Sequence, residues 1–215
     1  MLITCVYKTG GDFDADYVIA LYNSLNQYGD FLCFTDADDV PDCIPQTPLK
    51  HGWKGWWSKI EMLGYGKDML FFDLDVIITG NLDKMIYVAG KWDKMIMLSD
   101  FYRPSSPASG VMYIPAEVGI KLYERFLTKP DFYMVKHRGD QDFIAAQWSD
   151  IDRWQDLLGD DYIISYKAHV IKTAPKHFNI RHADVNNAKV VAFHGKPRIK
   201  DTAEKWNIEL EKING

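Results

Sequence analysis

The hydrophobic pattern of the first 75 residues alternates between short apolar runs and amphipathic stretches. The short runs predict three buried strands, over residues 2–7, 31–35 and 68–73. Between them, residues 14–28 place apolar side chains on one side at helical spacing before Gly29, and residues 58–66 predict a shorter helix that ends at a glycine. This β-α-β-α-β order is typical of a parallel sheet covered by helices, so it predicts an α/β fold.

The second half of the chain is less regular, but the same two patterns continue. Further strands are predicted over residues 94–100, 109–115, 162–166 and 189–195, and further helices over 116–128, over 202–212 and from Asp140 onward. No repeat, low-complexity tract or obvious linker interrupts the sequence. We therefore expect a single domain over residues 1–215, with a first half over 1–75 and a second half over 76–215.

Composition limits the classes of function before any motif is considered. The 215 residues carry 25 Lys and Arg against 30 Asp and Glu, and the net charge of -5 argues against nucleic acid as a general partner. The opening MLITCVYKTGG is too short and polar for a signal peptide, and no apolar run reaches a transmembrane length. Cys5, Cys33 and Cys43 show no metal-ligand spacing. We therefore expect a soluble, cytoplasmic protein.

Two carboxylates follow the third predicted strand. In FFDLDVIITGNLD, Asp73 and Asp75 come directly after a buried apolar run, where a negative charge needs a neutralising partner. Residues i and i+2 of an extended segment point to the same side, so both can converge on one cation. Mg²⁺ and Mn²⁺ prefer carboxylate oxygens and often share substrate phosphates. Ligands of parallel sheets collect beyond the carboxyl ends of the strands, where Asp36 also stands, so a binding crevice is predicted there.

Three further segments carry side chains that suit a metal-bound diphosphate. In AFHGKPR, a predicted strand delivers His194, Gly195 and Lys196: an imidazole for a Mn²⁺ shell, a glycine for close backbone approach and a point charge for phosphate. Lys59 is carried on the short helix before the D-x-D segment. SGVM, followed by GDQD, supplies small residues and two more carboxylates. Each residue alone has an ordinary structural explanation, so their common order along the chain carries the argument.

In this order, the motifs resemble those of nucleotide-sugar glycosyltransferases of the GT-A fold, most closely the glycogenin-like and lipopolysaccharide galactosyltransferase-like family. FFDLDVIITGNLD is similar to the D-x-D strand of that family, SGVMYIP to its N-[SA]-G-V segment, GDQDFI to its D-Q-D or D-Q-G segment, and FHGKP to its closing H-x-x-G-x-x-K-P motif. The resemblance covers nearly the whole chain, although only short motifs carry it. It implies one Rossmann-like GT-A domain with a mixed, mainly parallel central sheet flanked by helices.

The resemblance also implies how a donor is held. It implies Asp73, Asp75 and His194 as ligands of Mn²⁺ or Mg²⁺, and it places the nucleotide on the first half of the chain. The residues assigned to the nucleotide and its diphosphate are Tyr7, Lys8, Asp36, Lys59, Asp73, Gly195 and Lys196.

The second half is assigned to the sugar and the acceptor. Asp140 and Asp142 are the candidate catalytic acids or bases, and Lys196 would stabilise the leaving diphosphate. A helix N-terminus stabilises a charged carboxylate, which favours a sugar contact over proton abstraction. The expected reaction transfers a hexose from a nucleotide diphosphate sugar, a UDP-sugar by resemblance, to a hydroxyl of a glycan or protein acceptor. The residues assigned to substrate binding are Trp57, Ser109, Gly110 and Gln141.

The sequence departs from the family pattern at two places. Ala108 replaces the usual asparagine before Ser109, which removes one expected contact of a sugar hydroxyl. In the closing motif, Lys196 follows His194 by only two residues, and Arg198 stands where tryptophan is typical. We therefore expect the segment over the diphosphate to be built differently from that of the family.

Two other functions stay open on the sequence alone. FFDLDVIIT also matches the D-x-D-x-[TV] motif of haloacid-dehalogenase phosphatases, in which Asp73 would attack phosphorus and Asp75 would act as acid and base. That strand normally opens the core domain, whereas here a full β-α-β-α unit precedes it. A non-catalytic carbohydrate-binding protein would use Trp53, Trp56 and Trp57, since aromatic faces stack on sugars, although aromatics at helical spacing are more often core.

Overall fold

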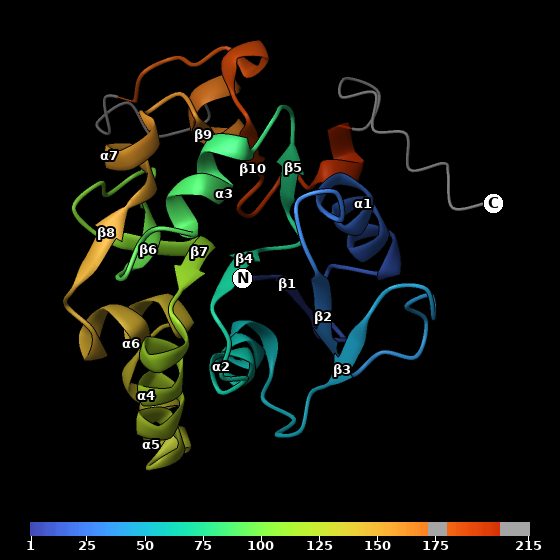
Figure 1. Ribbon diagram of the computed structural model, residues 1–215, viewed down its shortest axis with the longest axis vertical. Helices are drawn as coiled ribbons and strands as arrows, with labels where there is room; N and C mark the ends of the chain where they lie inside the picture. The colour runs from blue at the N-terminus through green and yellow to red at the C-terminus, as the bar shows by residue number, and fades with distance from the viewer. Residues whose placement is uncertain (172–179, 203–215) are drawn as a thin grey trace.

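A seven-stranded sheet runs through the centre of the structure, with the strand order β3-β2-β1-β4-β7-β6-β8 (Figure 1). The computed structural model describes residues 1–171 and 180–202. Four strand pairs of this sheet are parallel, and β7 alone runs antiparallel to its neighbours, β4 and β6. The mixed, mainly parallel sheet predicted above is therefore confirmed. Its strands are β1 (Leu2–Tyr7), β2 (Phe31–Thr35), β3 (Gln46–Pro48), β4 (Met69–Phe72), β6 (Met95–Ser99), β7 (Pro107–Ile114) and β8 (Ile151–Arg153).

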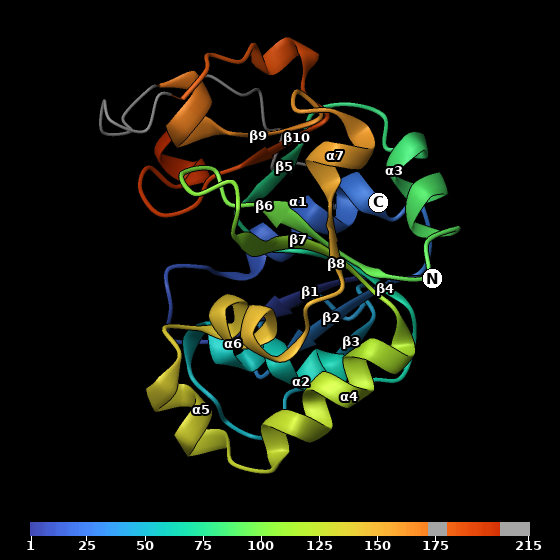
Figure 2. The same ribbon diagram turned by 90° about the vertical axis from the view of Figure 1, so that its left-hand side faces the viewer.

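Helices and a second, three-stranded sheet cover the two faces of the central sheet (Figure 2). The small sheet has the order β5-β10-β9, with β5 (Val76–Ile78) antiparallel and β9 (Ile163–Ser165) parallel to β10 (Val190–Ala192). It lies on the same side as α1, α3 and α7, whereas α2, α4, α5 and α6 lie on the other. The helices are α1 (Ala15–Leu25), α2 (Lys59–Leu63), α3 (Asp83–Ala89), α4 (Ala116–Leu127), α5 (Pro130–Lys136), α6 (Asp140–Gln147) and α7 (Trp154–Leu158).

The strand β4 is buried on both faces, which explains its continuous apolar sequence MLFF. Because successive side chains of a strand point to opposite faces, Leu70 and Phe72 pack into the cluster shared with α1 and the small sheet, and Phe71 packs into the cluster shared with α2, α4 and α6. A strand of this kind is held firmly from both sides. The residues that follow it, Asp73 to Asp75, therefore leave the core at a fixed point.

The elements predicted from periodicity mostly match those observed. The helix predicted over 14–28 ends at Leu25, and the predicted strands in the second half coincide with β6, β7, β9 and β10. The short elements β3, β5, β8, α3 and α7 had no clear pattern, because three-residue strands and helices of one or two turns carry too few periods to be recognised. The helix predicted over 202–212 lies outside the described residues after Thr202. No helix in the described ranges is long and apolar enough to cross a bilayer.

A close backbone contact fixes α2 against α4. A Cβ atom added at Gly119, in the first turn of α4, would lie 2.7 Å from the carbonyl oxygen of Leu63 at the end of α2. Any side chain at this position would therefore push the two helices apart. The contact matters for the site described below, because α2 begins with Lys59.

We predict that Gly119→Ala destabilises the protein by roughly 1–3 kcal/mol because the added methyl group overpacks the contact. Helix propensity alone would favour alanine by about 1 kcal/mol. The sign of the change in the free energy of unfolding therefore shows whether overpacking or helix propensity dominates. Urea unfolding of the variant gives the measurement. The control is Gly29→Ala, whose Cβ would lie at an ordinary 3.7 Å from Ile3 Cδ1. Equal stability of the two variants would contradict the prediction.

Candidate active site

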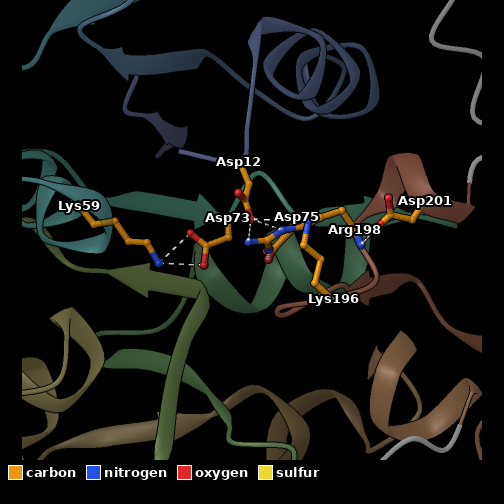
Figure 3. Close-up of polar contacts among 7 residues, drawn as sticks. All are labelled: Asp12, Lys59, Asp73, Asp75, Lys196, Arg198 and Asp201. Carbon is orange, nitrogen blue, oxygen red and sulfur yellow. Dashed lines mark hydrogen bonds and ion pairs between the residues drawn. The ribbon is translucent and has the colours of Figure 1, made fainter. Parts of the chain in front are cut away.

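The carboxylates of the D-x-D segment lie beyond the end of β4, and each is paired with a cation of the chain (Figure 3). Lys59 Nζ lies 2.8 Å from both carboxylate oxygens of Asp73. On the other side, Arg198 Nη1 donates a hydrogen bond of 3.1 Å to Asp75 Oδ2. Leu74 and Asp75 form a turn between β4 and β5, so the prediction of one extended segment is wrong here. The two side chains consequently point to different partners instead of converging.

Burial dominates the electrostatics of these carboxylates. Desolvation raises the pKa of Asp73 to about 7, although the charge of Lys59 lowers it and that of Asp75 raises it further. Desolvation also raises the pKa of Asp75, against the opposing charges of Lys59 and Arg198. For Lys59, burial disfavours the ammonium, but the carboxylates of Asp140 and Asp73 outweigh it and raise its pKa. The lysine is therefore a permanent cation between two acidic segments.

Asp140 is the second acidic partner of Lys59. It opens α6, is 3% exposed, and its Oδ2 lies 3.6 Å from Lys59 Nζ. This oxygen forms no hydrogen bond within the part of the chain that the structure describes. The preceding residue, Gly139, lies against the indole of Trp56. A side chain would not fit there, because an added Cβ would lie 2.8 Å from Trp56 Nε1. Asp140 Oδ2 is therefore ion-paired with Lys59 but lacks a hydrogen-bond donor among the described residues.

His194 does not join the carboxylates. Its Nε2 lies 2.6 Å from Ser165 Oγ, and its ring stacks on Phe101 at a centroid distance of 5.4 Å. Desolvation, followed by the charge of Lys167, lowers its pKa to about 4, so the imidazole is neutral. Among residues 1–171 and 180–202, no three His, Cys, Asp or Glu side chains are grouped so that they could hold a metal ion. The carboxylate pair is present, but the three-residue ligand set is not assembled in this conformation.

The ends of β1 and β2 bring two of the predicted nucleotide contacts together. The ammonium of Lys8 pairs with Asp36, which also accepts hydrogen bonds from Thr9, 2.8 Å from its backbone nitrogen and 3.1 Å from its hydroxyl. Burial opposes ionisation of Asp36, but the hydrogen bonds from Lys8 and Thr9 outweigh it and lower its pKa. Tyr7 is buried in the core. Lys8 and Asp36 are therefore accessible to a nucleotide, and the ring of Tyr7 is not.

The closing segment contributes a different cation from the one predicted. Lys196 is 71% exposed and lies 3.9 Å from Asp12 Oδ2, whereas Arg198 contacts both Asp12 and Asp75. Gly195 has a φ of +80°, which favours glycine at this turn. Arg198 was marked in the sequence only by its departure from the expected tryptophan. Nothing in the sequence pattern indicated Asp12.

The residues assigned to the substrate differ in how close they lie to Asp73 and in how exposed they are. Gly110 lies beside the site, because its carbonyl accepts the amide of Asp73 at 2.9 Å and an added Cβ would lie 3.8 Å from Asp73 Oδ2. Ser109, the neighbour of Gly110, is buried, whereas Gln141 and Asp142 are partly exposed on α6.

The assignment of Trp57 to substrate does not fit the structure. Its ring is buried and stacks on Phe126 in the core beneath α4. Trp56, at 55% exposure, is the tryptophan that reaches the surface beside Gly139. The two neighbours could not be told apart in sequence, because the short Gly55–Ser58 helical turn decides which one faces the core.

A cavity of about 450 Å³ lies beside Phe101, the residue that stacks on His194. It is open to solvent and is lined by residues of the loop after β6, of α7 and of β9. Aromatic and charged side chains both contribute to its lining, which suits a polar ligand that has apolar faces. Its lining includes Asp100, Phe101, Tyr102, Arg153, Asp156 and Asp160.

Solved structures of glycosyltransferases share this fold. The galactosyltransferase LgtC, solved with donor and acceptor sugar analogues, matches with a TM-score of 0.56 at 11% identity, over 92% of this chain and 88% of LgtC. GlyE of Streptococcus pneumoniae matches with a TM-score of 0.60 at 11% identity, over 92% of this chain and 56% of GlyE. Mouse xyloside xylosyltransferase 1 matches with a TM-score of 0.52 at 10% identity, over 89% of this chain and 96% of the xylosyltransferase. No protein-family model and no curated protein matches. The chain therefore has the GT-A fold.

We predict that Lys59→Met makes stability depend more strongly on pH. The pKa of Asp73 is higher in the folded protein than its ordinary value of 3.8, so this carboxyl group costs stability as pH rises from about 4 to 7. Lys59 lowers that pKa, so its removal extends the loss to higher pH. Urea unfolding should show a small deficit at pH 5 and a deficit of roughly 3 kcal/mol at pH 8.

The control for this experiment is Lys121→Met, which removes an exposed ion pair with Glu117 on α4. Solvent screens that pair, so its loss should change stability little at either pH. A deficit of Lys59→Met that is the same at pH 5 and pH 8 would show that Asp73 does not depend on the lysine.

Proposed function

We propose that the protein is a glycosyltransferase that takes a hexose from a nucleotide diphosphate sugar. The observation that carries the proposal is the cluster of Lys59, Asp73 and Asp140 beyond the end of β4, in a chain with the GT-A fold. A partly buried cation between two acidic segments, beyond the carboxyl end of a strand, is typical of a ligand-binding site. The phosphatase alternative fits the topology less well, because its nucleophile strand normally opens the core domain, whereas β1, α1, β2 and α2 precede β4 here.

The charge balance of the site supports a divalent metal. The three cations Lys59, Lys196 and Arg198 are each already matched by carboxylates of Asp12, Asp73, Asp75 and Asp140, so these side chains leave no excess positive charge for a diphosphate. Mn²⁺ or Mg²⁺ would be held by Asp73 and Asp75, with phosphate oxygens of the donor in the remaining positions. Once bound, it would act as a Lewis acid on the leaving diphosphate. His194 could join this shell only by giving up its bond to Ser165.

The other side chains would position and stabilise the donor. Lys59 keeps Asp73 and Asp140 in place and contributes positive charge near the diphosphate. Asp140 Oδ2 would accept a hydrogen bond from a hydroxyl of the donor sugar, which would supply the hydrogen-bond donor that this oxygen lacks in the described part of the chain. Lys196, exposed on the closing segment, is free to turn toward the phosphates.

The acceptor would approach from the cavity beside Phe101. Its aromatic and charged lining suits the hydroxyl groups and apolar faces of a glycan, and a glycosylated or hydroxyl-bearing protein segment offers the same chemistry. The acceptor oxygen replaces the diphosphate oxygen at the anomeric carbon, and its proton passes to a base. Asp140 and Asp142 of α6 are the candidates for that base if configuration is inverted. UDP is favoured as the nucleotide by the sequence resemblance.

We predict that one nucleotide sugar of a panel is hydrolysed slowly without an acceptor and that chelation abolishes this turnover. Mn²⁺ should restore it at least as well as Mg²⁺ if His194 enters the shell, because imidazole suits the softer ion. Release of the free nucleotide diphosphate is the measurement. Phosphate release from simple phosphomonoesters, with no binding of any nucleotide sugar, would instead support the phosphatase.

We predict that Asp140→Asn lowers kcat/KM for the donor by about 10- to 100-fold, because a charged hydrogen bond of roughly 1.5–3 kcal/mol is lost. Steady-state kinetics with the donor identified by the panel gives the measurement. Asp142→Asn is the matched comparison on the same helical turn and should lose less. A larger loss in Asp142→Asn would assign the sugar contact or the base to Asp142.

A further inference from the structure

Arg198 bridges two carboxylates that come from distant parts of the chain (Figure 3). Its Nη2 and Nε lie 3.0 Å and 3.3 Å from Asp12 Oδ2, and its Nη1 lies 3.1 Å from Asp75 Oδ2. The guanidinium also packs 4.7 Å above the ring of Phe13. At 18% exposure, this side chain is held from several sides. It occupies one oxygen of the carboxylate that the proposed metal needs.

The segment around Arg198 is fastened independently of Asp75. Lys200 Nζ lies 2.7 Å from Asp14 Oδ2 and 2.8 Å from Asp16 Oδ2, at the start of α1. The backbone nitrogen of Arg198 donates to Asp201 Oδ2 at 2.7 Å. The closing segment therefore stays docked on α1 even when the contact to Asp75 is broken. Only one of the three hydrogen bonds of the guanidinium goes to Asp75, so this contact can be released while two remain on Asp12.

We infer that Arg198 is an internal counter-cation of Asp75 that a divalent metal ion must displace, an inference that rests on the function proposed above. A buried carboxylate without a cation is costly, and the arginine removes that cost when no metal is bound. A metal ion that binds Asp75 takes over the same role. The guanidinium then remains on Asp12 at the edge of the diphosphate site. Arg198 and the metal thus compete for one ligand.

The test measures Mn²⁺ affinity without any nucleotide, by isothermal titration calorimetry. Arg198→Met should bind Mn²⁺ roughly three- to tenfold more tightly than the original protein, because the competing cation is gone. Arg198→Gln removes the charge with a polar side chain and should show the same direction. The matched control is Lys200→Met, which removes a cation from the same segment without touching Asp75. Its Mn²⁺ affinity should stay within about twofold.

A second titration in the presence of UDP separates this inference from the proposed function. If the original protein binds Mn²⁺ with UDP, and both Arg198 variants bind Mn²⁺ alone no more tightly than Lys200→Met does, the competition is wrong and the metal site stands. Weaker binding in both Arg198 variants would likewise overturn it, since the arginine would then help to hold the ligands. If no protein binds Mn²⁺ with or without UDP, the metal-dependent function and the inference fail together.

Discussion

The ion pairs of the partly buried Lys59 ammonium are the interactions on which the organisation of the site depends. The ammonium lies between the carboxylates of Asp73 and Asp140, so it joins the first residue of α2 to the end of β4 and to the start of α6. Each carboxylate would be costly in this environment without it, and the lysine would be costly without them. The three segments therefore stabilise one another's positions through these ion pairs. The backbone contact between Gly119 and Leu63 supports this arrangement, because it fixes α2 against α4.

The fold concentrates acidic groups at one edge of the sheet. Parallel strands end at the same edge, so Asp36 after β2 and Asp73 after β4 both lie at that edge, and the loop after β1 adds Asp12. The chain balances this excess with cations from other elements: Lys8 for Asp36, Lys59 for Asp73, Arg198 for Asp75. A site of this kind suits a ligand that brings its own cation, and a metal-bound diphosphate meets that requirement better than a bare anion does.

The two D-x-D carboxylates differ in how firmly their partners hold them. Lys59 contacts both oxygens of Asp73 and belongs to a helix packed in the core. Arg198 contacts one oxygen of Asp75 and belongs to a segment held at the surface by ion pairs with α1. Exchange of a cation is therefore easier at Asp75 than at Asp73. Arg198 stands where tryptophan is expected, and a tryptophan could not supply the cation that neutralises Asp75.

Much of the fold was determined by the sequence itself. The apolar runs of β1, β2 and β4 and the amphipathic α1 and α4 predict an α/β sheet, because burial on one or two faces leaves a local pattern. The position of Asp73 and Asp75 after a buried strand marked them as candidates, whereas Lys59 was assigned from its place before that strand and Asp140 from a motif that resembles a family segment. Only the tertiary structure decided the partners: the turn at Leu74 sends Asp75 to Arg198, and Ser165 holds His194 away from the carboxylates. The packing of the chain also decided that Trp57 is buried in the core and that Trp56 lies at the surface. Periodicity records which residues are buried, whereas contacts between distant segments depend on how the whole chain packs, and no local pattern encodes them.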